Sequence, residues 1–136
     1  MKLKVSRRGH FNAAHRLYRK DWDHERNQEV FGKCNNPNYH GHNYEVIVSV
    51  FGVIDPDTGF VMDMKILKDL LRDEVEEYLD HKNLNLDIEE FKDTNPTAEY
   101  IAVVIWNRLR PHIDKNLALE VQLFETPRNF VTYSGD

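Results

Sequence analysis

The chain has a single cysteine among its 136 residues, Cys34, so no internal disulfide bond can form. A chain without disulfides suits a reducing compartment, and no signal-peptide pattern opens it, so we expect a cytoplasmic protein. Its apolar runs are far shorter than a membrane span, which argues against a membrane partner. Acidic residues outnumber basic ones by 23 to 18, and this net charge of −5 disfavours nucleic acid as the main partner.

Internal repeats and low-complexity linkers are also absent from the sequence. A chain of 136 residues is long enough to bury a sizeable hydrophobic core. The hydrophobic content of 40% and the charged content of 30% are ordinary for folded proteins. We therefore expect one globular domain over residues 1–136.

Four segments have the composition of β-strands. Residues 2–13 begin with alternating charged and apolar side chains, which predicts an exposed strand. Residues 42–53 are rich in β-branched and aromatic side chains and predict a second strand. The segments 117–126 and 129–133, separated by a short turn that contains Pro127, predict a hairpin at the C-terminal end.

Two further segments have helical periodicity. In residues 64–79, apolar side chains recur at steps of three and four, which predicts an amphipathic helix, and Asp63 is placed to cap its N-terminus. A second helix is predicted over residues 96–110. There, Asn95 is placed as the N-cap, and Pro96 takes the first helical position.

The order of these elements, β-β-α-α-β-β, predicts an α+β fold with a four-stranded antiparallel sheet and two helices on one face. Such an open sheet has unpaired edges, which favour aggregation unless another subunit covers them, so we expect a homo-oligomer. The first two strands are separated by residues 14–39. A connection of this length inside a small domain is usually functional.

Three histidines are placed to meet at one end of the first two strands. His40 and His42 are two residues apart, so in an extended strand they point to the same side, and Gly41 between them allows a close approach. His15 follows the neighbouring strand. Three imidazoles can occupy three corners of a zinc tetrahedron and leave the fourth for water or substrate. The alternative is that they are ordinary surface or core histidines.

Cys34 precedes this histidine pair and allows three interpretations. It can be a fourth zinc ligand in a closed structural site, a small buried hydrophobic residue, or a catalytic base or nucleophile. A catalytic thiol needs a partner, and Asp80 followed by His81 offers an acid–imidazole pair. The same pair can instead be a helix terminus with a favourable cation.

Glu125 continues an apolar row in the third predicted strand. Leu119, Val121 and Leu123 alternate on the same face, and Glu125 is the next residue in that series. A carboxylate there either reaches solvent at the strand end or binds a specific pair of N–H donors. The edge of a planar ligand with two N–H groups is such a partner.

The ordered motifs VSRR, HRLY, FGKCNNPN, HGHNY, IDPDTG, LDHKNL, FET and a final Y-x-G resemble the 6-pyruvoyl-tetrahydropterin synthase family. The resemblance covers nearly the whole chain, and several motifs in the same order are far more specific than any one of them. It implies the tunnelling fold and a pterin synthase domain over residues 1–136. It also implies a hexamer built from two trimers, with active sites at the subunit interfaces.

The same resemblance implies roles for the candidate residues. Zn²⁺, with Mg²⁺ as the alternative ion, would be held by His15, His40 and His42. The catalytic residues would be Cys34 as general base, with Asp80, His81 and Glu125 in its proton relay. Glu125 would also hold the amino-pyrimidine edge of the pterin, with Thr97 and Glu99 as further substrate-binding residues.

The reaction implied by the resemblance starts from 7,8-dihydroneopterin triphosphate. Triphosphate is eliminated, and internal redox shifts reduce the ring and oxidise the side chain to a diketone, so no external redox cofactor is needed. The product is 6-pyruvoyl-tetrahydropterin, an intermediate of tetrahydrobiopterin-type synthesis. Candidate cations for the triphosphate are Arg16, Lys20 and Lys33, by charge and proximity alone.

Two other functions fit the same motifs. The segment NPTAE, residues 95–99, resembles the branch of the family that makes 6-carboxytetrahydropterin for the queuosine pathway. That branch generally has three residues between the cysteine and HGH, whereas this chain has five, which favours the pyruvoyl branch. Tyr39 also stands where many members have glycine. A function from another class is a non-catalytic hexamer that binds zinc or pterin, which would need neither Cys34 nor the pair Asp80–His81.

Overall fold

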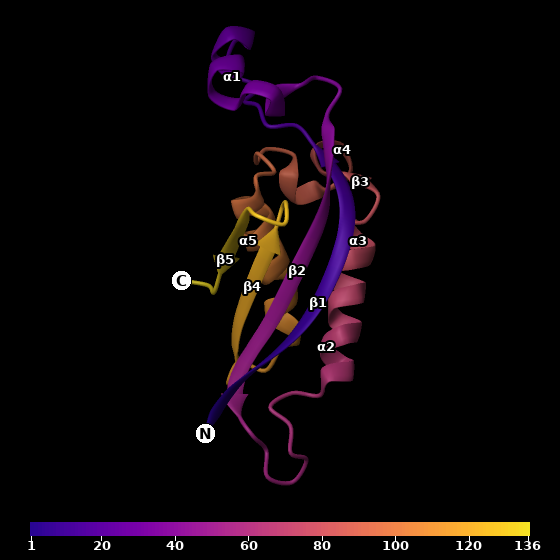
Figure 1. Ribbon diagram of the computed structural model, residues 1–136, viewed down its shortest axis with the longest axis vertical. Coiled ribbons are helices and arrows are strands. Elements are labelled where there is room, and N and C mark those ends of the chain that lie inside the picture. Colours follow the sequence, from indigo (N-terminus) through magenta and orange to yellow (C-terminus); the bar gives the residue numbers. More distant parts are fainter.

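Two long antiparallel strands form the centre of the sheet in this computed structural model, which describes residues 1–136 (Figure 1). Strand β1 spans Lys2–His15 and β2 spans His40–Val53. They pair along their whole length, from Lys2 opposite Val53 to His15 opposite His40. Both strands are two residues longer at the histidine end than the sequence pattern predicts, so all three histidines lie within the strands.

Three shorter strands complete a five-stranded sheet of order β3-β1-β2-β4-β5. Strand β4, Ala118–Phe124, pairs antiparallel with β2, and β5, Phe130–Tyr133, pairs antiparallel with β4. Strand β3, Lys82–Asn83, pairs parallel with β1. The expected four-stranded antiparallel sheet is therefore wrong in this detail, and the sheet is mixed. A strand of two polar residues has no alternation that a sequence pattern could reveal.

The predicted helix over residues 64–79 is confirmed as one continuous helical segment. It consists of α2, Met64–Leu71, a π-helical turn at Arg72–Glu76, and α3, Glu77–Leu79. The carboxylate of Asp63 caps it by accepting a 2.9 Å hydrogen bond from the backbone N–H of Lys65. Its apolar face packs on the sheet, where Leu67, Leu71 and Val75 are fully buried.

The second long helix, α5, spans Ala98–Leu109, and its cap differs from the prediction. Thr97, not Asn95, is the N-cap, because its hydroxyl accepts from the backbone N–H of Tyr100 at 3.2 Å. The Asn95 side chain instead accepts from the backbone N–H of Tyr18 at 3.1 Å. The cap therefore lies two residues later than expected, and the residue predicted to cap the helix joins it to the segment after β1. A 3-10 helix, Arg110–His112, follows α5.

The long segment between β1 and β2 projects beyond the end of the sheet (Figure 1). It contains α1, His24–Phe31, and a 3-10 helix at Gly32–Asn35 that carries Cys34. A further short helix, α4, Leu84–Asp87, and a 3-10 helix at Glu89–Phe91 lie between β3 and α5. The expectation of two helices is therefore incomplete. None of the helices is long and apolar enough to cross a membrane.

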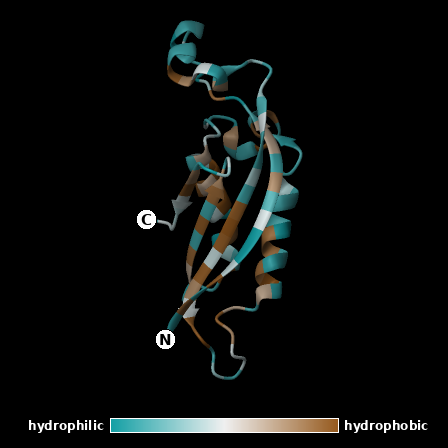
Figure 2. Ribbon diagram, in the orientation of Figure 1, coloured by the Kyte–Doolittle hydropathy of each residue, from teal (hydrophilic) through white to brown (hydrophobic).

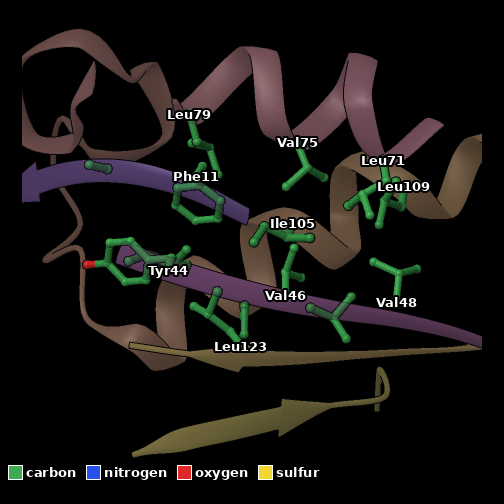
Figure 3. Close-up of a cluster of buried hydrophobic side chains, with 14 of the residues drawn as sticks. Phe11, Tyr44, Val46, Val48, Leu71, Val75, Leu79, Ile105, Leu109 and Leu123 are labelled. Atoms are coloured by element: carbon green, nitrogen blue, oxygen red, sulfur yellow. The ribbon is translucent and has the colours of Figure 1, made fainter. Parts of the chain in front are cut away.

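The core lies between the sheet and the helices α2, α3 and α5. Hydrophobic residues recur along the strands and helices in Figure 2, and Figure 3 shows their side chains between the two layers. On β2, the alternate residues Tyr44, Val46, Val48 and Val50 are fully buried. Figure 3 shows side chains from the strands pointing toward those of the helices, for example Phe11 toward Leu79. On each long strand, the series of alternate residues on the buried face ends in a histidine.

Candidate active site

The three histidines are the polar end of the buried face of the sheet. His15 follows Phe11 and Ala13 at two-residue steps on β1, and His40 and His42 precede Tyr44 in the same way on β2. The register places His15 opposite His40. The alternation that builds the core therefore also directs three imidazoles to one point, and the strand pairing brings them together.

One ring nitrogen from each histidine faces the other two. The three ligand atoms lie within 4.8 Å of one another. These atoms also stand out in the whole chain, because the buried side-chain nitrogen and oxygen atoms without a hydrogen-bond partner all belong to this cluster: His15 Nε2, His40 Nδ1 and His42 Nε2. Leaving three buried polar atoms unpaired is costly unless an ion binds them. The cluster can hold a metal ion.

The backbone fixes the tautomer of His15. Its Nδ1–H donates to the carbonyl oxygen of Pro96 at 2.8 Å, so Nε2 presents its lone pair to the cluster. The hydroxyl of Tyr44 lies 3.4 Å from the same Nδ1. Neither partner of His15 was predicted from the sequence. The sequence gives a weak indication of Tyr44, because it is the next residue after His42 on the same face of β2. It gives no indication of the Pro96 carbonyl.

Electrostatics keep the cluster neutral and ready to bind a cation. The pKa of His15 is lowered to about 4, mainly by burial and to a smaller extent by the nearby His40 and His42, while the hydrogen bond to the Pro96 carbonyl opposes the shift. Burial also lowers the pKa of His40, followed by repulsion from His42, while Glu125 opposes the shift. Neutral imidazole is the form that binds a metal ion.

Glu125 lies directly after β4 and beside the cluster. Its Oε2 is 4.0 Å from His15 Nε2, and its side chain is 25% exposed. It borders an open cavity of ≈ 540 Å³ that Thr97, Glu99 and Arg128 also line. The structure thus brings Glu125, Thr97 and Glu99 together around one cavity next to the histidine cluster. Arg128 was not predicted, because it lies in the turn after the FET motif.

Cys34 lines a second open cavity, of ≈ 710 Å³, together with His40 and His42. Its thiol is half-buried and does not belong to the group of candidate ligand atoms formed by the three histidines. The backbone N–H of Leu17 donates to the Cys34 carbonyl at 2.8 Å, which connects the 3-10 helix to the segment after His15. The thiol therefore faces the same space as two of the histidines without completing their ligand set.

Asp80 and His81 form a close pair at the end of α3. Asp80 Oδ2 lies 2.9 Å from His81 Nδ1, and Oδ1 accepts from the backbone N–H of Asn12 at 2.8 Å. This backbone hydrogen bond, more than His81, lowers the pKa of Asp80. His81 lines a third cavity with His42, whereas Cys34 does not. Within one chain, His81 and the thiol therefore line different cavities.

Tyr39 has the left-handed backbone conformation, with φ 68°. This region favours glycine, since a Cβ atom there clashes with the following carbonyl oxygen. The residue stands directly before His40 and ends the Cys34 loop. The loop therefore keeps the backbone shape that a glycine would adopt, and the tyrosine adopts it at a cost in strain.

Comparison with known proteins identifies relatives over the whole chain. The family described as 6-pyruvoyl tetrahydropterin synthase matches residues 4–136. The human 6-pyruvoyl tetrahydrobiopterin synthase is 47% identical over 132 residues, which cover 97% of this chain and 91% of the relative. The solved structure of the 6-pyruvoyl tetrahydropterin synthase from Caenorhabditis elegans matches with a TM-score of 0.93 at 38% identity, covering 100% of this chain and 97% of that one. A 6-carboxy-5,6,7,8-tetrahydropterin synthase from Rickettsia bellii is 30% identical over 148 residues, covering 95% of this chain and 98% of the relative.

Proposed function

The chain belongs to the 6-pyruvoyl tetrahydropterin synthase family, and we propose that it converts 7,8-dihydroneopterin triphosphate into 6-pyruvoyl-tetrahydropterin with elimination of triphosphate. One observation carries the proposal beyond similarity. The three unpartnered imidazole nitrogens meet at one point, and two of these histidines share a cavity with the only thiol of the chain. A cation site beside a single thiol suits an enzyme that removes protons from carbon.

Zn²⁺ is the ion that this donor set fits best. Three neutral imidazoles leave a fourth position for the substrate, as in catalytic zinc sites, whereas Mg²⁺ prefers oxygen ligands. Held by His15, His40 and His42, zinc would lower the pKa of a substrate hydroxyl and would stabilise enolate-like charge. The protein prepares this site through His15, whose Nδ1–H is already bound to the Pro96 carbonyl.

Cys34 acts as the general base in this proposal. Its thiolate takes a proton from a carbon of the substrate side chain, and the pair Asp80–His81 passes protons to and from the thiol. Because His81 and the thiol line different cavities of one chain, we infer that the pair that serves each thiol comes from a neighbouring subunit. His81 suits this role, since its side chain is 79% exposed while Asp80 holds it at 2.9 Å.

The cavity beside Glu125 binds the pterin ring. The carboxylate of Glu125 accepts two hydrogen bonds from the amino-pyrimidine edge, a charge-assisted contact that fixes the orientation of the ring. Thr97 and Glu99, at the N-terminus of α5, line the same cavity and are the further residues proposed to bind the ring. Since Glu125 also lies 4.0 Å from His15, a ring held there places its side chain near the cation.

The 6-carboxytetrahydropterin synthase reaction is the second candidate function. It uses the same substrate, and two observations favour it: the segment at residues 95–99 and the relative at 30% identity. Against it stand the five residues between Cys34 and His40 and the higher identity of the pyruvoyl relatives. A non-catalytic zinc- or pterin-binding protein is the third candidate, and it would leave Cys34 without a role.

Product identification distinguishes these functions. The purified protein is incubated with 7,8-dihydroneopterin triphosphate and Zn²⁺, and the products are identified by mass spectrometry, with Cys34→Ala as the matched control. The proposal requires triphosphate and 6-pyruvoyl-tetrahydropterin from the wild type. A carboxylated product supports the second function, and unchanged substrate supports the third.

A further inference from the structure

Arg16 connects the first metal ligand to the loop that carries the thiol. It directly follows His15, and its guanidinium donates two hydrogen bonds to Asn35, the residue after Cys34. Nε binds the Asn35 carbonyl at 2.9 Å, and Nη2 binds Asn35 Oδ1 at 3.1 Å. The backbone N–H of Leu17 adds a third bond, to the Cys34 carbonyl. Two consecutive residues after His15 thus bind two consecutive residues of the thiol loop.

The position of Arg16 is itself fixed. Its backbone N–H donates to Asn85 Oδ1 at 2.8 Å, and its carbonyl accepts from Asn85 Nδ2 at 2.9 Å. Its guanidinium carbon lies 4.0 Å from the ring centre of Tyr18. Asn85 belongs to α4, which packs against β1. Arg16 is therefore attached to the body of the fold on one side and to the loop on the other.

The loop has few other attachments to the sheet. The 3-10 helix Gly32–Asn35 has no side-chain cap. Asn36 and Tyr39 donate their backbone N–H groups to other carbonyls of the same loop. The Asn35 side chain is fully buried, and its second polar atom lies 3.4 Å from Gln28 of α1. Since α1 projects beyond the sheet, the bonds from Arg16 and Leu17 hold the loop to the strands that carry the histidines (Figure 1).

We propose that Arg16 is a positioning residue that holds Cys34 at the correct distance from the metal ligands. This inference rests on the proposed function, in which Cys34 is the general base. In this role Arg16 acts through its two hydrogen bonds to Asn35 and not through the substrate. A displacement of about 1 Å in a catalytic group is enough to cost ~10²-fold in rate.

The competing role for Arg16 is as a cation for the triphosphate, and the two roles differ in kinetics. Loss of a phosphate contact raises KM. A lysine at the same position keeps the positive charge and brings KM part of the way back to the wild-type value. Loss of the two hydrogen bonds from Arg16 to Asn35 lowers kcat at unchanged KM. Lysine does not replace the planar fork that binds the carbonyl and the side chain of Asn35 together.

The test uses Arg16→Ala and Arg16→Lys in the full chain, with zinc content matched to wild type. Steady-state kinetics give kcat and KM, and iodoacetamide labelling gives the reactivity of Cys34, which is the only cysteine and therefore the only thiol labelled. For Arg16→Ala we expect kcat to fall by ~10²-fold at near-wild-type KM, and labelling to become faster because the loop opens more often. Arg16→Lys should show the same defects in weaker form, and it carries the test if the alanine variant does not fold.

Arg110→Ala is the matched control. Arg110 also binds a loop through backbone carbonyls, those of Ile113, Asp114 and Leu117, at 2.7–3.0 Å, but at the opposite end of the sheet. Its loss should destabilise the fold without changing kcat or the labelling of Cys34. A merely structural role for Arg16 predicts the same result for both arginines.

Two outcomes overturn the inference. One is wild-type kcat and labelling in Arg16→Ala, and the other is a raised KM at unchanged kcat that Arg16→Lys repairs. Failure of the proposed function is a different result, because the wild-type protein would then not turn over the substrate at all. Labelling of Cys34 would still report whether Arg16 restrains the loop.

Discussion

At the scale of single residues, the histidine cluster results from the alternation of side chains between the two faces of β1 and β2. His40 and His42 could be placed on one face from the sequence alone, and so could Glu125 at the end of the apolar row of β4. The proximity of His15 to His40 and His42 depends on the pairing of β1 with β2. The sequence indicated this pairing only because the two strands follow each other along the chain. The Pro96 carbonyl that orients His15 could not be predicted, because a backbone acceptor has no residue type.

Metal content separates ligands from the thiol. The wild-type protein should carry about one zinc per chain. His40→Ala should lose most of it, since it removes one of three ligands, whereas Cys34→Ala should keep it because the thiol lies outside the cluster. Elemental analysis of the purified variants measures both. Equal loss of zinc in the two variants would make Cys34 a ligand.

The buried histidines also make the metal-free protein sensitive to acid. Since the pKa of His15 is lowered to about 4 in the fold, the unfolded chain binds a proton more readily between pH 6.5 and 4. The contribution of neutral His15 to the free energy of unfolding is therefore fully present above pH 6.5. It is lost as the pH falls toward 4, by on the order of 3 kcal/mol. Urea unfolding across this range measures the loss. His15→Leu should remove this part of the slope, while His24→Gln, on the exposed surface of α1, should keep it.

At the scale of elements, long periodic segments could be predicted and short polar ones could not. The helix over residues 64–79 and the two long strands have strong repeating patterns, and the structure confirms them. Strand β3 and helix α4 are two and four residues long, so tertiary contacts determine them. The cap of α5 was misplaced because both Asn95 and Thr97 are good capping residues, and only the fold decides between them.

The loop that joins the thiol to the histidines has a strain that mutation can measure. At φ 68°, Tyr39 occupies a conformation that costs a residue with a Cβ atom about 1–2 kcal/mol. Tyr39→Gly and Tyr39→Ala both delete the ring, but only glycine removes the clash. We expect the glycine variant to be the more stable of the two by about 1 kcal/mol, measured by thermal unfolding. An alanine variant at least as stable would mean that the loop does not need this conformation.

At the scale of the whole molecule, a single chain has unpaired sheet edges and does not bring all the proposed catalytic residues into one cavity. The sheet has two edges, at β3 and β5, and His81 and Cys34 line different cavities within one chain. The order of the predicted elements indicated an oligomer only through the open edges of the sheet, and the placement of His81 and Cys34 in different cavities adds a chemical reason. The number of subunits was not predictable from periodicity, because it depends on surface shape.

Solution mass tests this assembly. We expect light scattering of the purified protein at micromolar concentration to give a hexamer, or a trimer as its half. A mixing experiment adds a direct check, in which Cys34→Ala and His81→Ala chains, each expected to be slow on its own, are combined after mild dissociation. Shared sites predict that activity returns in the mixture. A stable, active monomer would contradict sites at subunit interfaces.

The most direct test of the central claim, that Cys34 removes a proton from a substrate held by zinc and Glu125, is single-turnover kinetics at matched zinc content. Cys34→Ala should bind 7,8-dihydroneopterin triphosphate almost as tightly as wild type but react ~10²–10⁴-fold more slowly. Glu125→Ala should show weaker binding, by about 1.5–3 kcal/mol, because buried N–H donors of the ligand lose a charged acceptor. Wild-type single-turnover rates in Cys34→Ala would contradict the account and remove the thiol from the mechanism.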